Sequence, residues 1–125
     1  MKSGTRPKSF AEKSASISSA ARTALDLVQL DPVIHERTRL SILTALLTTF
    51  EPGCSFSDLR DTLTLTDGNL LTHLRVLEEA GLIQLLKEGA GRSSSTTVRM
   101  SSIGRKSFQT YLDQLEALVR AARGK

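Results

Sequence analysis

Tryptophan is absent from this sequence, and tyrosine and cysteine occur once each. Aromatic residues make up only 4% of the 125 residues, so the core must consist mainly of Leu, Ile, Val and Ala. This composition is typical of a compact, helix-rich fold. A chain of this length supports one domain around one core and is too short for two.

The single cysteine, Cys54, is expected in a turn and excludes both an intrachain disulfide and a zinc cluster built on several cysteines. No pair among Cys54, His35 and His73 has the spacing of zinc ligands. The sequence leaves open a nucleophilic arrangement of Cys54 with a histidine, although no third group that would orient the histidine stands out. Residues 89–91 (Gly-Ala-Gly) are not a phosphate-binding loop, because no helix follows them and the Walker lysine is missing. We predict no catalytic residues, no metal site, no cofactor and no enzymatic activity.

No apolar run approaches the roughly 18 residues that a membrane span requires, and the basic N-terminus lacks the apolar segment of a secretory signal. We therefore expect a soluble, cytoplasmic protein. Lys and Arg number 17 against 13 Asp and Glu, which gives a net charge of +4. This excess attracts polyanions, but charge alone does not separate nucleic acid from an acidic membrane.

Residues 1–14 contain Lys, Ser and Gly and are predicted to form a flexible basic tail. The folded domain is expected over residues 15–125. Between Ala15 and Gln29 the apolar residues recur at helical spacing, which predicts an amphipathic helix. Its apolar face would consist of Ile17, Ala21, Ala24 and Val28.

A core helix is predicted to begin at Asp31-Pro32, because Asp caps free amides and Pro fits the first helical position. Pro52-Gly53 would end it. The expected apolar stripe consists of Val33, Ile34, Leu40, Leu43, Leu46, Leu47 and Phe50.

Two short helices joined by a tight turn are predicted over residues 57–80. Ser57 is the expected N-cap of the first helix and Thr66 that of the second. Gly81 follows the second helix, where a left-handed residue is favoured. This unit is a helix-turn-helix. The buried residues of its second helix would be Leu70, Leu74 and Leu77.

After this unit the pattern changes to that of strands. Residues 82–87 and 96–100 are predicted strands, with a glycine-containing turn over 88–92. A hairpin at 82–100 directly after a helix-turn-helix would be the wing of a winged helix. A closing helix, capped by Ser101 or Ser102, is predicted over about residues 102–122. The predicted fold is thus mainly α with a small β-hairpin.

In a helix-turn-helix the second helix lies in the DNA major groove. Asn pairs with adenine and Arg with guanine, so Asn69 and Arg75 are candidates for base recognition. Gly68 would allow a close approach to the sugar-phosphate backbone, whereas Asp67 would repel phosphate and is expected to stabilise the helix start. On the hairpin, Arg92 is best placed for DNA contact. The full set of predicted DNA-binding residues is Thr66, Gly68, Asn69, Thr72, His73, Arg75, Lys87, Arg92 and Arg99.

The closing helix carries a longer apolar stripe than one winged-helix core needs. An exposed remainder would be a patch that a soluble monomer seldom tolerates. We therefore predict a homodimer joined through terminal helices, which would set two recognition helices about 34–36 Å apart on an inverted-repeat operator. The alternative is that this helix folds back over its own core. The predicted interface residues are Ile17, Ala21, Ala24, Val28, Phe108, Tyr111, Leu112, Leu115, Leu118 and Val119.

The stretch from Leu30 to about Val119 resembles the winged-helix transcriptional regulators related to the MarR and ArsR groups. The segments that carry the resemblance are LDPVIHERTRLSIL (30–43), FSDLRDTLTLTDGNLLTHLRVLEEAGLI (56–83) and residues 91–108. The resemblance implies three helices followed by a hairpin and a final helix, dimerisation through terminal helices, and promoter binding.

This resemblance also implies roles for individual residues. Arg92 occupies the basic position of the wing. Two residues depart from the family pattern: Leu71 stands where a small residue is common, and Val76 where Lys or Arg is common, which predicts one phosphate contact fewer. The positions at the start of the recognition helix are Thr66, Asp67, Gly68, Asn69, His73 and Arg75.

The sequence thus predicts a regulator that binds specific double-stranded DNA. A repressor is favoured over an activator, because a repressor needs only to occlude a promoter and the chain has no room for a separate activation domain. The main alternative is a protein–protein adaptor, since winged helices also serve as interaction modules. A small thiol- or metal-dependent sensor enzyme is a third. The operator and any effector are not specified by the sequence.

Overall fold

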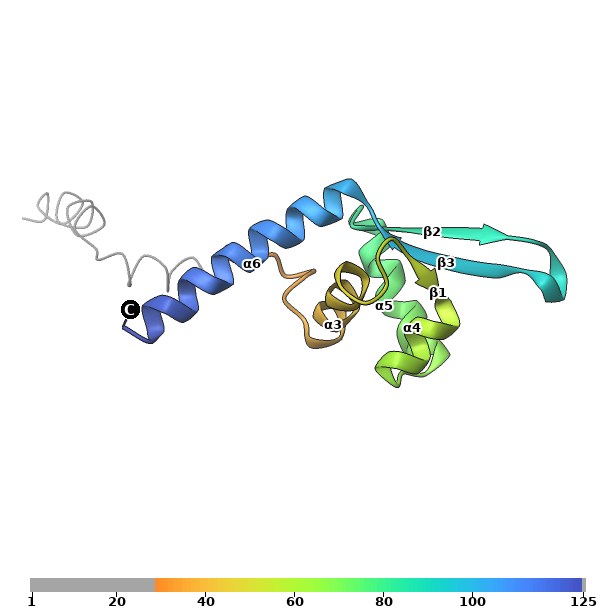
Figure 1. The fold of residues 1–125 in the computed structure, drawn as a ribbon, viewed down its shortest axis with the longest axis horizontal. Coiled ribbons are helices and arrows are strands. Elements are labelled where there is room, and N and C mark those ends of the chain that lie inside the picture. The colour runs from red at the N-terminus through yellow and green to blue at the C-terminus, as the bar shows by residue number, and fades with distance from the viewer. Residues whose placement is uncertain (1–28, 125) are drawn as a thin grey trace, which may run out of the picture. The chain divides into compact units, whose positions relative to one another are not determined.

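The computed structural model describes residues 29–124 (Figure 1). The predicted tail and nearly all of the predicted 15–29 helix lie outside the described residues. The chain divides into two compact units, of which residues 31–112 form one, while 113–124 belong to the other. The elements are α3 (Arg37–Leu47), β1 (Cys54–Ser55), α4 (Phe56–Leu63), α5 (Asp67–Glu79), β2 (Ile83–Glu88), the 3-10 turn η2 (Gly91–Ser93), β3 (Ser95–Met100) and α6 (Ser102–Ala122).

The core helix α3 begins five residues later than predicted, at Arg37 instead of Pro32. Asp31 does act as a cap, but of a turn: its Oδ1 accepts a hydrogen bond from the Val33 amide at 2.9 Å, and its carbonyl accepts one from His35 at 2.8 Å. The N-cap of α3 is Glu36, whose carboxylate accepts from the Arg39 amide at 2.8 Å. The helix also ends at Leu47, before the predicted Pro52-Gly53. Its buried residues are Ile42, Leu43, Ala45 and Leu46.

The two helices of the helix-turn-helix, α4 and α5, are present. The cap of α4 is Ser55 and not Ser57, because the Ser55 hydroxyl accepts from the Asp58 amide at 3.0 Å. Thr66 caps α5 as predicted, accepting from the Asn69 amide at 3.1 Å. Thr64 ends α4 in the left-handed region, with φ of 57°. The fully buried residues of α5 are Leu70, Leu74 and Leu77, as predicted.

The predicted hairpin is part of a three-stranded antiparallel sheet with the order β1-β3-β2. Strands β2 and β3 pair from Ile83↔Met100 to Glu88↔Ser95 and extend beyond the helices in Figure 1. Strand β1 was not predicted, since two residues show no periodicity.

The prediction that Cys54 lies in a turn was wrong, because Cys54 is in β1 and pairs with Val98. Burial, together with the nearby Asp58 carboxylate, raises the pKa of the Cys54 thiol to about 11. The nucleophilic form of cysteine is the thiolate. The raised pKa thus favours the protonated thiol of Cys54 at neutral pH.

The first turn of α6 is attached to the end of α5. The Ser101 hydroxyl donates to the Gly81 carbonyl at 2.6 Å and accepts from the Gly104 amide at 2.8 Å, so Ser101 is the cap rather than Ser102. A Cβ at position 104 would collide with the Leu82 backbone. This contact explains why a glycine is buried inside a helix.

Candidate nucleic-acid interface

The outward face of α5 lies opposite its buried leucines and is polar apart from the exposed Leu71. Gly68, Asn69, Thr72 and Arg75 are all exposed on it. The Thr72 hydroxyl donates to the Gly68 carbonyl at 2.9 Å, so its lone pairs remain to accept a hydrogen bond from outside. Thr66 is exposed as well, but its hydroxyl is used as the helix cap.

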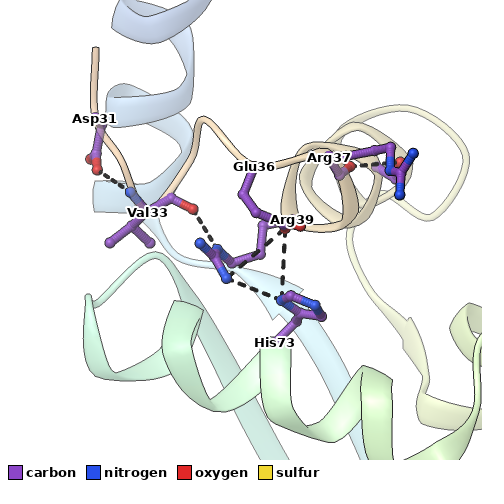
Figure 2. Close-up of polar contacts among 7 residues, drawn as sticks. Asp31, Val33, Glu36, Arg37, Arg39 and His73 are labelled. Atoms are coloured by element: carbon purple, nitrogen blue, oxygen red, sulfur yellow. Dashed lines mark hydrogen bonds and ion pairs between the residues drawn. The ribbon is translucent and has the colours of Figure 1, made fainter. Parts of the chain in front are cut away.

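His73 is placed differently from these residues. Its side chain is only 17% exposed, and its Nδ1 lies 3.1 Å from Nη1 of Arg39 and 3.7 Å from Oε1 of Glu36 (Figure 2). Arg39 in turn donates from Nε to the Val33 carbonyl at 2.6 Å. His73 therefore holds α5 against α3 and is not brought together with the exposed face.

A second cross-element contact fixes the start of α5. Nη1 of Arg60, on α4, donates to Oδ1 of Asp67 at 2.8 Å, and its Nε donates to Asp61 at 2.9 Å. The positive charge of Arg60 thereby offsets the negative charge of Asp67 at the N-terminal end of α5, the end that would approach DNA. Neither Arg60 nor Arg39 was singled out in the sequence, because no local pattern links an arginine to a partner on another helix.

The three basic residues predicted on the hairpin lie in different places. Arg92 is exposed in η2, at the tip. Lys87 pairs with Thr96 on the side of the sheet that faces α5, since both line a groove with α5 residues. Arg99 alternates with buried Val98 and Met100, so it lies on the opposite side, where its Nε donates to Gln84 at 2.8 Å. Arg99 is thus separated from the α5 surface.

A groove of about 640 Å³ lies between α5 and the hairpin. Its lining includes the charged residues Asp67, Arg75, Glu78 and Lys87, from both walls. The apolar lining residues are Phe56, Leu71, Leu74 and Leu85. This groove lies alongside the exposed face of α5, because Gly68 and Arg75 belong to both.

Phe108 and Tyr111, predicted at a dimer interface, are each 1% exposed within the single chain. Their rings stack with centroids 6.2 Å apart, and the Tyr111 hydroxyl lies 2.6 Å from Nδ1 of His35. They belong to the chain's own core, so for these two residues the alternative of a helix covering its own core is the correct one. Further along α6, Leu112, Leu115 and Leu118 are half-buried, and Val119 is exposed. Ile17, Ala21, Ala24 and Val28 lie outside the described residues.

No helix between residues 29 and 124 is long and apolar enough to cross a membrane. In the same part of the chain, no three His, Cys, Asp or Glu residues gather closely enough to hold a metal ion.

The winged helix DNA-binding domain family matches residues 38–119, a span that includes both helices of the helix-turn-helix and the hairpin. The chain belongs to this family. An uncharacterized protein of Methanocaldococcus jannaschii is 35% identical over 83 residues, which cover 66% of this winged-helix chain and 88% of that protein. The predicted resemblance to winged-helix regulators is confirmed.

Solved structures agree with this assignment. A transcriptional regulator homologue from Pyrococcus horikoshii OT3 is 31% identical with a TM-score of 0.70, over 78% of this winged-helix chain and 95% of that one. The transcriptional repressor CouR, bound to a 23-mer DNA duplex, shares the fold at 20% identity, with a TM-score of 0.58 over 93% and 79% of the two chains. A possible transcriptional regulator for arsenical resistance also shares the fold, at 23% identity and with a TM-score of 0.54. The match covers 74% of this winged-helix chain and 92% of that one.

Proposed function

We propose that this winged-helix protein is a transcriptional repressor that binds an inverted-repeat operator as a homodimer, with α5 in the major groove. The observation that carries the proposal is the exposed face of α5, where Asn69, Thr72 and Arg75 stand on one rigid helix. Asn and Arg side chains can form the paired hydrogen bonds that distinguish adenine and guanine, and a Thr hydroxyl can bond to either base. Similarity to a regulator homologue and to a DNA-bound repressor supports the same function.

The hairpin supplies the phosphate contacts in this proposal. Arg92 at the exposed tip would contact the backbone beyond the major groove, and Lys87 would do so closer to α5. Arg99 is left out, because it lies on the other side of the sheet and donates to Gln84. His73 is left out as a direct contact, because its ring lies against Arg39.

The homodimer in this proposal forms through the second half of α6. With Phe108 and Tyr111 in the core, the part of the proposed contact that α6 contributes consists of Leu112, Leu115, Leu118 and Val119, the last of which is 43% exposed. An apolar stripe at the end of a 21-residue helix is well suited to pack against its symmetry mate. The two-fold axis would require an inverted-repeat operator, and occupancy of that site would occlude a promoter.

Selection of bound duplexes from a random DNA pool tests the proposal. The wild type should enrich an inverted repeat whose half-sites are one DNA turn apart. Asn69→Ala and Arg75→Ala should each weaken binding to that site by about 1–3 kcal/mol and relax its base preference. Arg92→Ala should weaken binding to all sequences alike, whereas Arg99→Ala, the matched control on the opposite side of the sheet, should change base preference least.

Failure to enrich any sequence would contradict the proposal and would favour the protein–protein adaptor. Enrichment of a single half-site without an inverted repeat would contradict the dimer alone. A base preference that changes with Arg92→Ala and not with Asn69→Ala would reverse the roles of the two elements.

A further inference from the structure

We propose that Leu71 recognises the 5-methyl group of a thymine in the operator by apolar contact. The inference rests on the proposed function and names a base that α5 would select.

The position of Leu71 on α5 suits base contact. Base edges are met by the N-terminal part of a recognition helix, and Leu71 is the fifth residue of α5, which begins at Asp67. Gly68 precedes it by three residues and Arg75 follows by four, so the three lie on one side of the helix. A Cβ at position 68 would have no neighbour within 4 Å. Space is therefore open at position 68, one helical turn before Leu71 on the same side of α5.

The surroundings of Leu71 distinguish it from an ordinary exposed leucine. Single apolar side chains on a surface are common and need no explanation. Among the described residues, four large apolar side chains are exposed: Leu71, Leu86, Ile103 and Val119. Leu71, at 39% exposure, is the one on α5, and it lines the groove together with the apolar Phe56, Leu74 and Leu85. Its exposed surface is thus continuous with an apolar wall.

The chemistry of the bases then selects the partner. Thymine presents a methyl group in the major groove, whereas the edges of adenine, guanine and cytosine carry hydrogen-bonding groups and no methyl group. A leucine side chain neither donates nor accepts, so placing it against a polar edge would remove water from that edge without replacing the hydrogen bonds.

The charges around Leu71 are compatible with DNA in the same place. Arg75 and Lys87 line opposite walls of the groove and carry positive charge. Asp67 is paired with Arg60 at 2.8 Å. Glu78 lies seven residues, or two helical turns, after Leu71, toward the end of α5 that lies away from the base-contacting start.

Replacement of thymine by deoxyuridine in the selected operator tests the inference, because deoxyuridine keeps every hydrogen-bonding group and lacks only the methyl. One thymine in each half-site is expected at which this replacement weakens wild-type binding by about four-fold per half-site, as burial of one methyl group implies. Leu71→Ala should bind the two duplexes equally. Leu86→Ala, a control of similar exposure (38%) on the opposite side of the hairpin, should keep the four-fold difference.

Thermal unfolding of the three proteins checks that each variant is folded. Two results would overturn the role of Leu71 and still support DNA binding. The first is salt-dependent binding that deoxyuridine does not weaken, and the second is an equal loss of affinity on deoxyuridine replacement in wild type and Leu71→Ala. An operator without thymine in the α5 half-sites would also overturn it. If no duplex is bound at all, both the inference and the proposed function fail.

Discussion

The imidazole Nδ1 of His73, on α5, lies 3.1 Å from Nη1 of Arg39, on α3 (Figure 2). The same guanidinium donates from Nε to the Val33 carbonyl at 2.6 Å and lies 3.9 Å from the Glu36 carboxylate. One arginine thus joins the turn at residues 31–36, the core helix and the helix that would enter DNA. Because the Arg39 side chain is only 16% exposed, we expect it to position α5 and not to contact phosphate.

Arg39→Ala is expected to lower the free energy of unfolding by about 1–3 kcal/mol, the usual cost of losing hydrogen bonds to a charged group in a partly buried setting. Operator affinity should fall too, but its dependence on salt should not change, because no phosphate contact is lost. Urea unfolding and DNA titration at several salt concentrations measure the two effects. Arg37→Ala, at an exposed position on the same helix, should stay within about 0.5 kcal/mol of wild type. Equal stability of Arg39→Ala and wild type would contradict the positioning role.

The stability of the fold should fall in acid through Glu36. Burial acts to raise the pKa of Glu36, but hydrogen bonds from the backbone of Arg39 and Thr38, with the nearby His73 and Arg39 side chains, lower it overall. A carboxyl with a lower pKa in the folded chain stabilises the fold above its unfolded value of about 4.3 and loses this contribution as pH falls through the folded value. The free energy of unfolding should therefore decrease below about pH 4.3, and by less in Glu36→Gln. Parallel curves for the two proteins would show that Glu36 makes no such contribution.

Two glycines in helices should respond oppositely to alanine. Gly104→Ala is expected to destabilise the protein by about 1–3 kcal/mol, since its Cβ would collide with the Leu82 backbone. In Gly68→Ala the added Cβ has no neighbour within 4 Å, so this substitution should stabilise α5 by up to about 1 kcal/mol. If Gly68 allows the close approach to DNA, the same variant should bind the operator more weakly although it is more stable. A Gly104→Ala variant as stable as wild type would contradict the attachment of α6 to residues 81–82.

If the protein is a homodimer, its mass in solution should fall to that of a monomer when a charge is added to the apolar stripe of α6. Leu115→Glu should convert the protein to a folded monomer that has lost tight operator binding, because a buried unpaired carboxylate is costly. Ala117→Glu adds the same charge to an exposed position of the same helix and should remain dimeric. Light scattering at micromolar concentration measures both. A monomeric wild type would contradict the dimer directly.

Much of the fold followed from local signals in the sequence. The Thr66 cap, the buried Leu70, Leu74 and Leu77, and the left-handed Gly81 each depend on residues within one helix, and all are found in the structure. Boundaries were less predictable when two capping residues lay close together. Asp31 caps a turn and Glu36 caps α3. The hydrogen bond from Arg39 to the Val33 carbonyl accompanies the later start of the helix, and no local sequence signal reveals it.

The site was predicted less completely, since much of it depends on contacts between elements. The exposed face of α5 follows from helical periodicity, but the placement of His73 against Arg39 and of Asp67 against Arg60 does not. Strand alternation could have separated Arg99 from the α5 surface, because Val98 and Met100 are its apolar neighbours. The α6 stripe is continuous in sequence, so periodicity alone could not show where core ends and free surface begins.

The salt dependence of operator binding by wild type and Arg92→Ala tests the central claim most directly. Fluorescence anisotropy with the selected duplex should show log K falling linearly with log salt, with about 0.9 added to the slope for each phosphate neutralised. Arg92→Ala should reduce that slope by about 0.9 while keeping the base preference set by α5. An affinity that does not change between low and physiological salt would contradict DNA binding by this winged helix.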